Sequence, residues 1–384
     1  MRNLTLFLLV FITPAIAQGP RIEFSNTKES LRGVSAVSRQ IGWASGTHGT
    51  YLRTTDAGVT WIPAQVPDAA NLDFRAVAAF SADEAFLMSA GPGEQSRIYH
   101  TADAGQHWDL QFTNSNPKGF FDSMVFWDPK HGVVLGDPIP DETGKLKFEL
   151  LMTDDGKAWH EIPPQQLPPA MEGEGAFAAS NSCIAILRMQ EWQSAWKSGA
   201  SAPRPPAEND RASAPDRNIW FATGGKSARV FHSADRGKTW DVVDTPILHG
   251  PDSAGIFSIA FRDSTHGVIA GGNYKRPNDD GPNLAFTEDG GKTWKLWSIH
   301  PQAYFSAVAY DQRVNQEAIA QAAKPNQKPR FAPTLPERIF IAAPDFIFDF
   351  RPPLNPRRIN GRKKQNITFN AIAPFPEGGA LAVG

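Results

Sequence analysis

Short apolar runs separated by polar turns recur along the whole chain, at intervals of roughly fifty residues. Each interval holds four runs in which β-branched and aromatic residues alternate with polar ones, as is typical of half-buried β-strands. The pattern predicts a series of four-stranded units. Their first strands are expected at Leu31–Val37, Phe74–Phe80, Ser123–Trp127, Cys183–Leu187 and Phe257–Phe261.

One octapeptide, Ser/Thr-x-Asp-x-Gly-x-x-Trp, marks the turn between the third and fourth runs of each unit. A hydroxyl and a short carboxylate can cap the N–H groups of a tight turn, and Gly supplies its positive φ. The Trp ring would then pack between neighbouring units, so we interpret these residues as structural and not catalytic. The third copy carries Met152 in place of the hydroxyl. The five Asp and Trp pairs are Asp56 and Trp61, Asp103 and Trp108, Asp154 and Trp159, Asp235 and Trp240, and Asp289 and Trp294.

A sixth unit without an intact octapeptide follows these five. Its runs are Phe305–Tyr310, Arg338–Ala343 and Phe346–Phe350, and two more runs, Ile367–Phe375 and Ala380–Gly384, begin a seventh unit. Radial repetition lets each unit pack only on its neighbours. We therefore predict one all-β domain over residues 18–384, a seven-bladed β-propeller whose incomplete last blade is closed by a strand at Arg21–Ser25.

Two segments interrupt the regular spacing, at residues 190–217 and 311–337. The first is rich in Ala, Pro and Ser, a composition that cannot form a packed core. Both fall between the first and second strands of a blade. We expect both insertions to project from the face that carries the octapeptide turns.

The first 17 residues read as a secretory signal peptide. Arg2 precedes an apolar run that ends at Ala15-Ile16-Ala17, which is too short to span a bilayer. Cleavage near Ala17-Gln18 would leave a secreted or periplasmic protein without a transmembrane segment. Because no cysteine follows the cleavage site, a lipid anchor is not expected.

The cysteine, charge, glycine and histidine content limits the classes of partner and cofactor that the protein could bind. The single cysteine, Cys183, lies in an apolar run and is expected to be a buried, inert thiol. Near-balanced charge, with 38 basic and 40 acidic residues, argues against a nucleic-acid partner. The glycine-rich Gly91–Ser96 lacks a dinucleotide fingerprint, and the nine histidines show no metal-ligand spacing. We predict no cofactor, no metal and a monomer.

Polar loops at the mouth of the ring form the candidate binding site. These loops enter each innermost strand or join the second strand to the third, so their side chains converge on the central funnel. Such a set suits a peptide or a sugar, although each residue could equally be a solvated loop position. The predicted binding residues are Arg32, Arg75, Asp122, Glu174, Lys226, Tyr274 and Asn370.

Three segments carry a family resemblance: Glu174–Phe177, Trp220–Gly225 and Asp235–Trp240. Together with the Asp-box octapeptides they resemble the exported seven-bladed propellers related to the photosystem II stability and assembly factor. The resemblance implies a non-catalytic scaffold that binds a protein partner or assists complex assembly.

The alternative is a sialidase-like glycoside hydrolase or a glycan-binding propeller, since sialidases share the Asp-box. That family carries Arg-Ile-Pro near the first blade, whereas Arg21-Ile22 is followed here by Glu23. A Tyr/Glu nucleophile pair would have to come from residues such as Tyr304 and Glu174.

Overall fold

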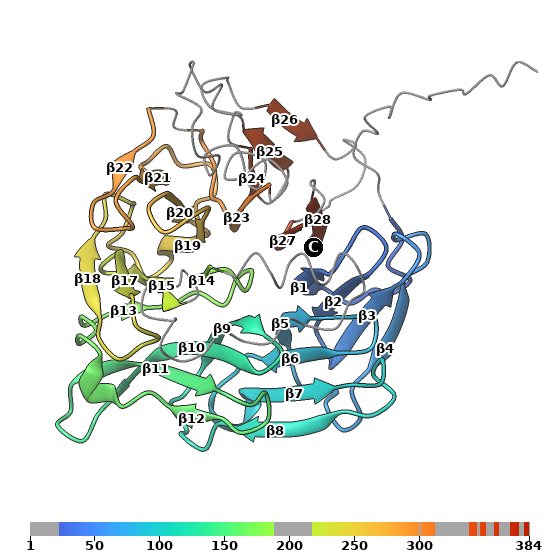
Figure 1. The fold of residues 1–384 in the computed structure, drawn as a ribbon. Coiled ribbons are helices and arrows are strands. Elements are labelled where there is room, and N and C mark those ends of the chain that lie inside the picture. The colour runs from blue at the N-terminus through green and yellow to red at the C-terminus, as the bar shows by residue number, and fades with distance from the viewer. Residues whose placement is uncertain are drawn as a thin grey trace, which may run out of the picture.

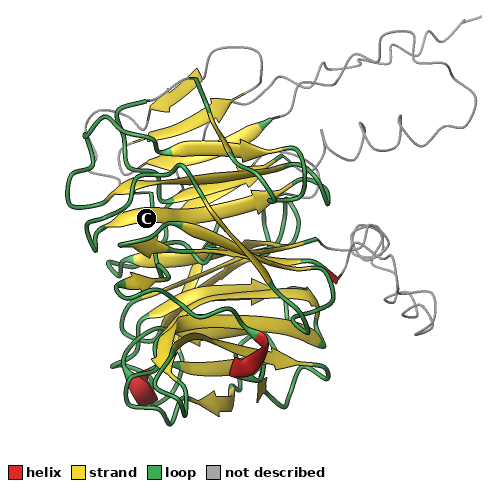
Figure 2. Cartoon of the chain, turned by 90° about the vertical axis from the view of Figure 1, so that its left-hand side faces the viewer, coloured by secondary structure: helices red, strands yellow, loops and turns green. Residues whose placement is uncertain are grey.

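The strands form sheets that radiate around a central axis (Figure 1) and stack face to face in the side view (Figure 2). This computed structural model describes residues 23–187, 217–298, 301–311, 338–343, 346–350, 357–360, 369–375 and 380–383. Every strand pair in these ranges is antiparallel and neighbouring strands are joined in chain order within most sheets. The prediction of an all-β propeller is confirmed.

The first three blades are regular four-stranded sheets, each ordered from the axis outward. Blade one contains β1 (Leu31–Ala36), β2 (Gly42–Gly46), β3 (Thr50–Thr54) and β4 (Ile62–Gln65); blade two contains β5 (Phe74–Ala79), β6 (Ala85–Ser89), β7 (Arg97–Thr101) and β8 (Asp109–Thr113); blade three contains β9 (Phe121–Asp128), β10 (His131–Pro140), β11 (Leu146–Thr153) and β12 (His160–Glu161). Two short 3-10 helices, η1 (Gly93–Gln95) and η2 (Pro164–Gln166), lie in the connecting loops.

The next three blades follow the same order, and blade five is extended by two short strands. Blade four contains β14 (Ile184–Ile186), β15 (Ile219–Ala222), β17 (Arg229–Ser233) and β18 (Asp241–Asp244); blade five contains β19 (Ala254–Phe261), β20 (Gly267–Asn273), β21 (Leu284–Thr287) and β22 (Lys295–Leu296), with β13 (Glu174–Gly175) and β16 (Gly224–Gly225) added at its inner edge; blade six contains β23 (Ala307–Tyr310), β24 (Ile339–Ala343), β25 (Phe346–Phe350) and β26 (Arg357–Asn360). The predicted insertions, residues 190–217 and 311–337, lie outside the described residues except for Arg217 and Asp311.

The sequence predicts seven blades, the last of them incomplete, whereas the described residues form six complete blades. Among the described residues, six sheets have four strands or more, whereas β27 (Ala371–Pro374) and β28 (Ala380–Val383) form a sheet of two strands. This small sheet lies beside β1 on one side and β23 on the other.

The predicted closing strand at Arg21–Ser25 is not seen in the described part of that segment. Residues 23–25 belong to no strand, and Arg21 and Ile22 lie outside the described residues. The Glu23 carboxylate instead accepts a hydrogen bond from Trp61 Nε1 at 2.8 Å, and Asn26 Nδ2 donates to the Trp61 carbonyl at 3.0 Å. Within residues 23–26, hydrogen bonds with Trp61 therefore take the place of strand pairing.

The core consists of apolar layers between neighbouring blades. One layer joins blade one to the two-stranded sheet through Leu31, Ala44, Leu52, Trp61, Ala371 and Val383. A second joins blades four and five, where Trp220 stacks on Phe261 with ring centroids 3.8 Å apart. Sheet faces packed in this way bury both sides of each inner strand, which explains the nearly continuous burial of β2, β6 and β20.

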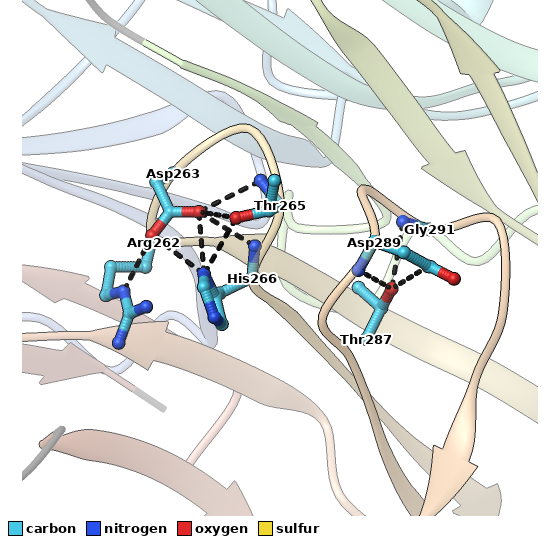
Figure 3. A network of polar contacts seen from close by, with 7 residues as sticks. All are labelled: Arg262, Asp263, Thr265, His266, Thr287, Asp289 and Gly291. Carbon is cyan, nitrogen blue, oxygen red and sulfur yellow. Dashed lines mark hydrogen bonds and ion pairs between the residues drawn. The ribbon is translucent and has the colours of Figure 1, made fainter.

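The octapeptide turns are closed by their own side chains. In blade five, Gly291 N donates to Thr287 Oγ1 at 2.9 Å, and Thr287 Oγ1 donates to Asp289 Oδ1 at 2.8 Å (Figure 3). The Asp289 carboxylate also accepts the N–H of Thr293 at 2.9 Å. These hydrogen bonds lower the pKa of Asp289 to about 2, against the opposing effect of its slight burial.

The third octapeptide is built one residue later than the sequence pattern places it. Thr153 Oγ1 donates to Asp155 Oδ1 at 3.3 Å, and the Asp155 carboxylate accepts the N–H groups of Lys157 and Ala158 at 2.8 Å. Asp154, the predicted capping residue, has a side chain that is 66% exposed. With Met152 at the usual hydroxyl position, Thr153 is the nearest residue able to cap Gly156.

A second recurrent turn joins the first two strands on the same face. In blade five, Asp263 Oδ1 accepts the N–H groups of Thr265 at 2.9 Å and His266 at 2.8 Å (Figure 3). Gly290 N then donates to the Thr265 carbonyl at 2.9 Å, so the two turns of the blade support each other. The capping residues of the equivalent turns in blades one, two and three are Ser38, Ser81 and Asp128.

Candidate functional site at the mouth of the funnel

A loop at residues 176–182 crosses the central channel between β13 and β14. The Ala178 carbonyl accepts a hydrogen bond from Arg75 Nη1 of blade two at 3.1 Å. Ser180 Oγ donates at 2.6 Å to the Ser306 carbonyl, which belongs to the loop that enters blade six. One short loop thus spans the ring from blade two to blade six.

Two further residues of this loop contact blades three and five, which lie between blades two and six. Asn181 Oδ1 accepts from Met124 N at 2.7 Å and from Ser123 Oγ at 3.1 Å, both in blade three. Ser182 Oγ donates to Ser258 Oγ of blade five at 2.7 Å. Asn181 has a positive φ of 57°, a conformation that Asn tolerates better than most residues. The loop forms a floor across the channel, and we call residues 176–182 the channel plug.

Two of the predicted residues, Arg32 and Arg75, meet at one acidic side chain. Arg75 Nε donates to Asp73 Oδ2 at 2.8 Å, and Arg32 Nε lies 3.9 Å from Asp73 Oδ1. The side chains of Arg32, Arg75 and Asp73 are 32%, 28% and 23% exposed. Two guanidinium groups share one carboxylate here, so the cluster keeps a net positive charge at the surface of the mouth.

Asp122 is deeply buried beside this cluster, at 1% exposure. Burial raises the pKa of Asp122 well above its ordinary value and the negative charge of Asp137 raises it further, while Arg75 opposes the change. The pKa of Asp137 is also raised by burial, although Ala176 N donates to its Oδ1 at 2.9 Å. Both carboxyl groups are therefore easier to protonate than exposed ones. Asp122, predicted as a binding residue, lies below the surface of the mouth.

The sequence predicts Glu174 at the surface of the mouth, but its side chain is buried. Its carboxylate is buried and pairs with Arg229, whose Nε donates to Oε1 at 2.9 Å and whose Nη2 lies 2.5 Å from Oε2. Thr223 Oγ1 and Met171 N also donate to it, at 2.6 and 2.8 Å. With its acceptor sites occupied, Glu174 ties β13 to blade four.

Asn370 also differs from the prediction. Its Nδ2 donates to the Leu31 carbonyl at 2.7 Å, so it joins the two-stranded sheet to blade one. This hydrogen bond uses one of the two amide N–H groups of Asn370, so the residue links the small sheet to blade one.

Lys226 and Tyr274 lie at the rim, as expected for loop residues. Lys226 is 56% exposed with its Nζ 3.8 Å from Glu172 Oε1. Tyr274 is 47% exposed and contacts Phe257 edge-on at a centroid distance of 6.1 Å. Phe257 in turn stacks on Phe177 of the channel plug at 3.9 Å. The blade-five side of the mouth is thus aromatic, whereas the blade-one side is cationic.

Sequence reasoning missed Asp73 and the channel plug. Asp73 sits two residues before Arg75 and would be read as an ordinary loop acid. The plug contains only small residues around Phe177, and its polar contacts involve the Ala178 carbonyl and the side chains of Ser180 and Asn181. Its Asn and Ser residues next to an apolar run are the only signal that could have indicated buried loop contacts.

Other functional features are limited within the described ranges. Those residues contain no group of three or more His, Cys, Asp or Glu arranged to hold a metal ion. Their helices include none long and apolar enough to cross a membrane. Cys183 is fully buried as predicted, and burial raises the pKa of its thiol.

Sequence comparisons place the chain near one family. The family profile described as "Photosynthesis system II assembly factor YCF48" matches residues 21–119. The chloroplastic photosystem II stability/assembly factor HCF136 of Arabidopsis thaliana is 22% identical over 271 residues, which cover 66% of this chain and 63% of the relative. The photosystem II assembly lipoprotein Ycf48 of Synechococcus sp. (strain CC9902) is 21% identical over 304 residues, which cover 74% of this chain and 81% of the relative. The match therefore spans less than two thirds of the length of the chloroplast relative.

Comparison with one solved structure, a WD40 propeller, supports the fold. The WD40 β-propeller domain of Doa1 superposes with a TM-score of 0.53 at 10% identity, covering 93% of this chain and 90% of that one. The structure described as "YCF48 bound to D1 peptide" is 17% identical, with a TM-score of 0.36 over 86% of this chain and 96% of that one.

The radial four-stranded sheets define the class of protein as a β-propeller. Within that class, the chain resembles the photosystem II stability and assembly factors, as its sequence predicted.

Proposed function

We propose that this protein is an exported, non-catalytic propeller that binds a protein partner at its mouth and assists the assembly of a complex. The names of its relatives describe assembly factors, which act on other proteins. The observation that carries the proposal is the partly exposed Arg32–Asp73–Arg75 cluster, which a hydrogen bond from Arg75 joins to the channel plug. Charged and aromatic side chains that are exposed on different blades suit contacts spread along a protein segment.

The chemistry of the exposed residues at the mouth favours an extended segment with acidic and aromatic residues. Arg guanidinium groups bind carboxylates in bidentate geometry, and the exposed edge of Tyr274 offers an aromatic surface on the other side of the mouth. Of the predicted binding residues, we retain Arg32, Arg75, Lys226 and Tyr274 as partner contacts. Asp122 lies below the surface, and Glu174 and Asn370 are structural.

Glycoside hydrolysis is the alternative function, and two observations weigh against it. A catalytic carboxylate must be able to reach its substrate, but Glu174 is buried in its ion pair with Arg229. Burial also raises the pKa of Tyr304, which disfavours a phenolate nucleophile. Glycan binding through Tyr274 and Phe257 stays open as a non-catalytic version, and a glycan array with purified protein would separate it from protein binding.

The remaining parts of the proposal concern the chain as a whole. We propose cleavage near Ala17-Gln18, export as a monomer, and a structural role for the octapeptide Asp and Trp residues. We also propose that the two-stranded sheet β27–β28 occupies the place of a seventh blade, because it lies between blade six and blade one.

The proposed function can be tested by crosslinking in the native envelope, followed by affinity purification and mass spectrometry. The captured partner would then be titrated against wild type and the Arg32→Ala, Arg75→Ala double variant at low and moderate salt. Weaker binding with a reduced salt dependence is expected, since exposed charges act through screened attraction. The control is Lys292→Ala, which removes an exposed positive charge from the octapeptide face. Equal affinity of the double variant and wild type at both salt concentrations would exclude the mouth as the binding site.

A further inference from the structure

Phe257 is the extra residue of a β-bulge in β19, the innermost long strand of blade five. Ile256 pairs with Gly271 and Ser258 pairs with Ala270, so Phe257 has no partner residue in β20. Bulges often re-aim the side chain of the extra residue. The innermost strands of blades one, two and three are bulged in the same way, and their extra residues are Arg32, Arg75 and Asp122. Phe257 therefore belongs to the same ring of positions around the channel as the two arginines of the mouth.

Three more aromatic side chains surround Phe257, and we call these four residues the aromatic cluster. Phe177 of the channel plug stacks on the Phe257 ring, with centroids 3.9 Å apart and planes inclined by 14°. Tyr304 and Tyr274 meet the same ring edge to face, at centroid distances of 4.7 and 6.1 Å. Phe257 is buried, Phe177 and Tyr304 are partly buried, and Tyr274 is exposed. The cluster thus brings together rings from the plug, from blade five and from the loop that enters blade six.

Backbone contacts hold the two tyrosines of the cluster in place. Tyr304 N donates to the Pro277 carbonyl at 2.8 Å, and Tyr274 N donates to the Ser253 carbonyl at 3.2 Å. Gly272 has a φ of 128°, and a Cβ at this position would lie 3.2 Å from the Cα of Tyr304. A glycine is therefore needed where blade five passes the loop of Tyr304. Rings that are positioned in advance lower the entropic cost of binding a ligand.

The polar groups of the cluster indicate which ligands it can accept. In the part of the chain that the structure describes, neither the Tyr274 nor the Tyr304 hydroxyl takes part in a hydrogen bond. Burial raises the pKa of the Tyr304 phenol and the nearby Tyr274 raises it further, so this phenol keeps its proton at neutral pH and can donate it. Lys275 Nζ lies over the Tyr274 ring, 5.9 Å from the centroid. This ammonium group would repel a cationic ligand, such as a methylated amine, that aromatic rings otherwise attract.

We propose that the aromatic cluster binds proline residues of the protein partner, presented in a polyproline II segment. Proline-rich segments dock on aromatic side chains in several families of recognition domain. A polyproline II backbone makes no internal hydrogen bonds, so its carbonyl groups are free to accept from the two phenols. The inference rests on the proposed function and deepens it, because it names the residue type that the blade-five side of the mouth accepts.

A simple probe for this site is a fluorescent decaproline peptide with both ends blocked, titrated with the purified protein by fluorescence polarisation. We expect saturable binding with a Kd below about 1 mM. A Gly-Ser peptide of equal length with the same label is the control, because it is flexible and has no rings to pack on the cluster. It should show no saturable binding in the same range.

Three variants locate the binding on the molecule. Tyr274→Ala removes the most exposed ring of the cluster and should weaken decaproline binding about tenfold or more. Tyr304→Phe keeps the ring but removes one hydroxyl, and should weaken binding about fivefold. Phe24→Ala is the matched control, because Phe24 is 79% exposed and follows Glu23, which is bound to Trp61 of blade one. Thermal unfolding would verify that all three variants fold.

Several results would overturn the inference. These are absence of saturable decaproline binding, equal binding of the Gly-Ser peptide, or equal weakening by Tyr274→Ala and Phe24→Ala. Tighter binding of cellohexaose or of a trimethyl-lysine peptide than of decaproline would assign the cluster to another class of ligand and contradict the inference.

The same probe separates this inference from the proposed function. The Arg32→Ala, Arg75→Ala variant should bind decaproline as wild type does, because the blocked peptide carries no carboxylate. If decaproline fails to bind while the captured partner still depends on the two arginines, only the proline site is wrong. If decaproline binds while the captured partner is indifferent to the arginines, only the cationic contact of the proposed function is wrong.

Discussion

Arg75 of blade two donates a hydrogen bond from Nη1 to the carbonyl of Ala178, 103 residues away in the chain, at 3.1 Å. The same guanidinium binds Asp73 through Nε. One side chain therefore holds both the cationic cluster of the mouth and the loop that closes the channel. Arg32 has neither role, because its Nε lies 3.9 Å from Asp73 and makes no hydrogen bond within the described residues.

This difference predicts unequal effects of two similar substitutions. Arg75→Ala removes a charged donor from the Ala178 carbonyl and should lower the free energy of unfolding by about 1–3 kcal/mol. Arg32→Ala should change it by no more than about 0.5 kcal/mol. Urea unfolding of both variants would measure this, and equal stabilities would mean that Arg75 does not anchor the plug.

Asn181 provides a second test of the channel plug. Asn181→Gly keeps a residue that tolerates the positive φ but removes the acceptor for Met124 N and Ser123 Oγ. The loss of acceptor for a buried N–H should cost about 1–3 kcal/mol. Asn181→Asp, which retains an acceptor oxygen, serves as the comparison. Faster hydrogen exchange at Met124 in the glycine variant only would assign the effect to this contact.

The sequence predicted the propeller because its signals are local. Alternation and the turn octapeptide fix each blade from residues close in the chain, and Trp61 packs between sheets as the pattern suggested. The third octapeptide was misplaced by one residue because Asp154 and Asp155 are adjacent and both fit a turn. The structure places only some of the predicted binding residues at the surface of the mouth. Loop position alone cannot show that the Glu174 carboxylate pairs with Arg229, 55 residues later in the chain.

The shifted third turn can be checked directly. Asp155→Ala removes the acceptor for the N–H groups of Lys157 and Ala158 and should cost about 1 kcal/mol, as for other capping residues. Asp154→Ala, at an exposed side chain, should change stability by less than about 0.5 kcal/mol. The reverse order of stabilities in thermal unfolding would restore the register that the sequence pattern indicates.

The ion pair between Glu174 and Arg229 predicts a strong effect of breaking one side only. Glu174→Gln leaves the guanidinium buried without its counter-charge and should cost about 3–5 kcal/mol. The double substitution Glu174→Gln, Arg229→Met removes the charge from both partners and should recover much of this loss. A double-mutant cycle measures the coupling, and additive losses would show that the two residues act independently.

Glu149 gives the protein a pH-dependent stability of definite sign. Its carboxyl group is buried between blades two and three, where Asn114 Nδ2 donates to both oxygens at 2.9 Å, and burial raises its pKa to about 7. The folded protein therefore holds a proton that the unfolded chain releases above its ordinary pKa of 4.5. The contribution to stability is fully present below pH 4.5 and is lost as the pH rises to about 7, by roughly 3 kcal/mol at most.

The measurement is the free energy of unfolding by urea at several values between pH 4.5 and 8, for wild type and Glu149→Gln. Glutamine still accepts from Asn114 but carries no titratable proton, so the variant should lose most of the decline seen in wild type. The buried Asp122 and Asp137 also have raised pKa values and leave a residual slope of the same sign. Capping carboxylates such as Asp103 and Asp289, with pKa values lowered to about 2, act in the opposite direction and only at lower pH. Identical slopes in both proteins would place the titration elsewhere and contradict the assignment to Glu149.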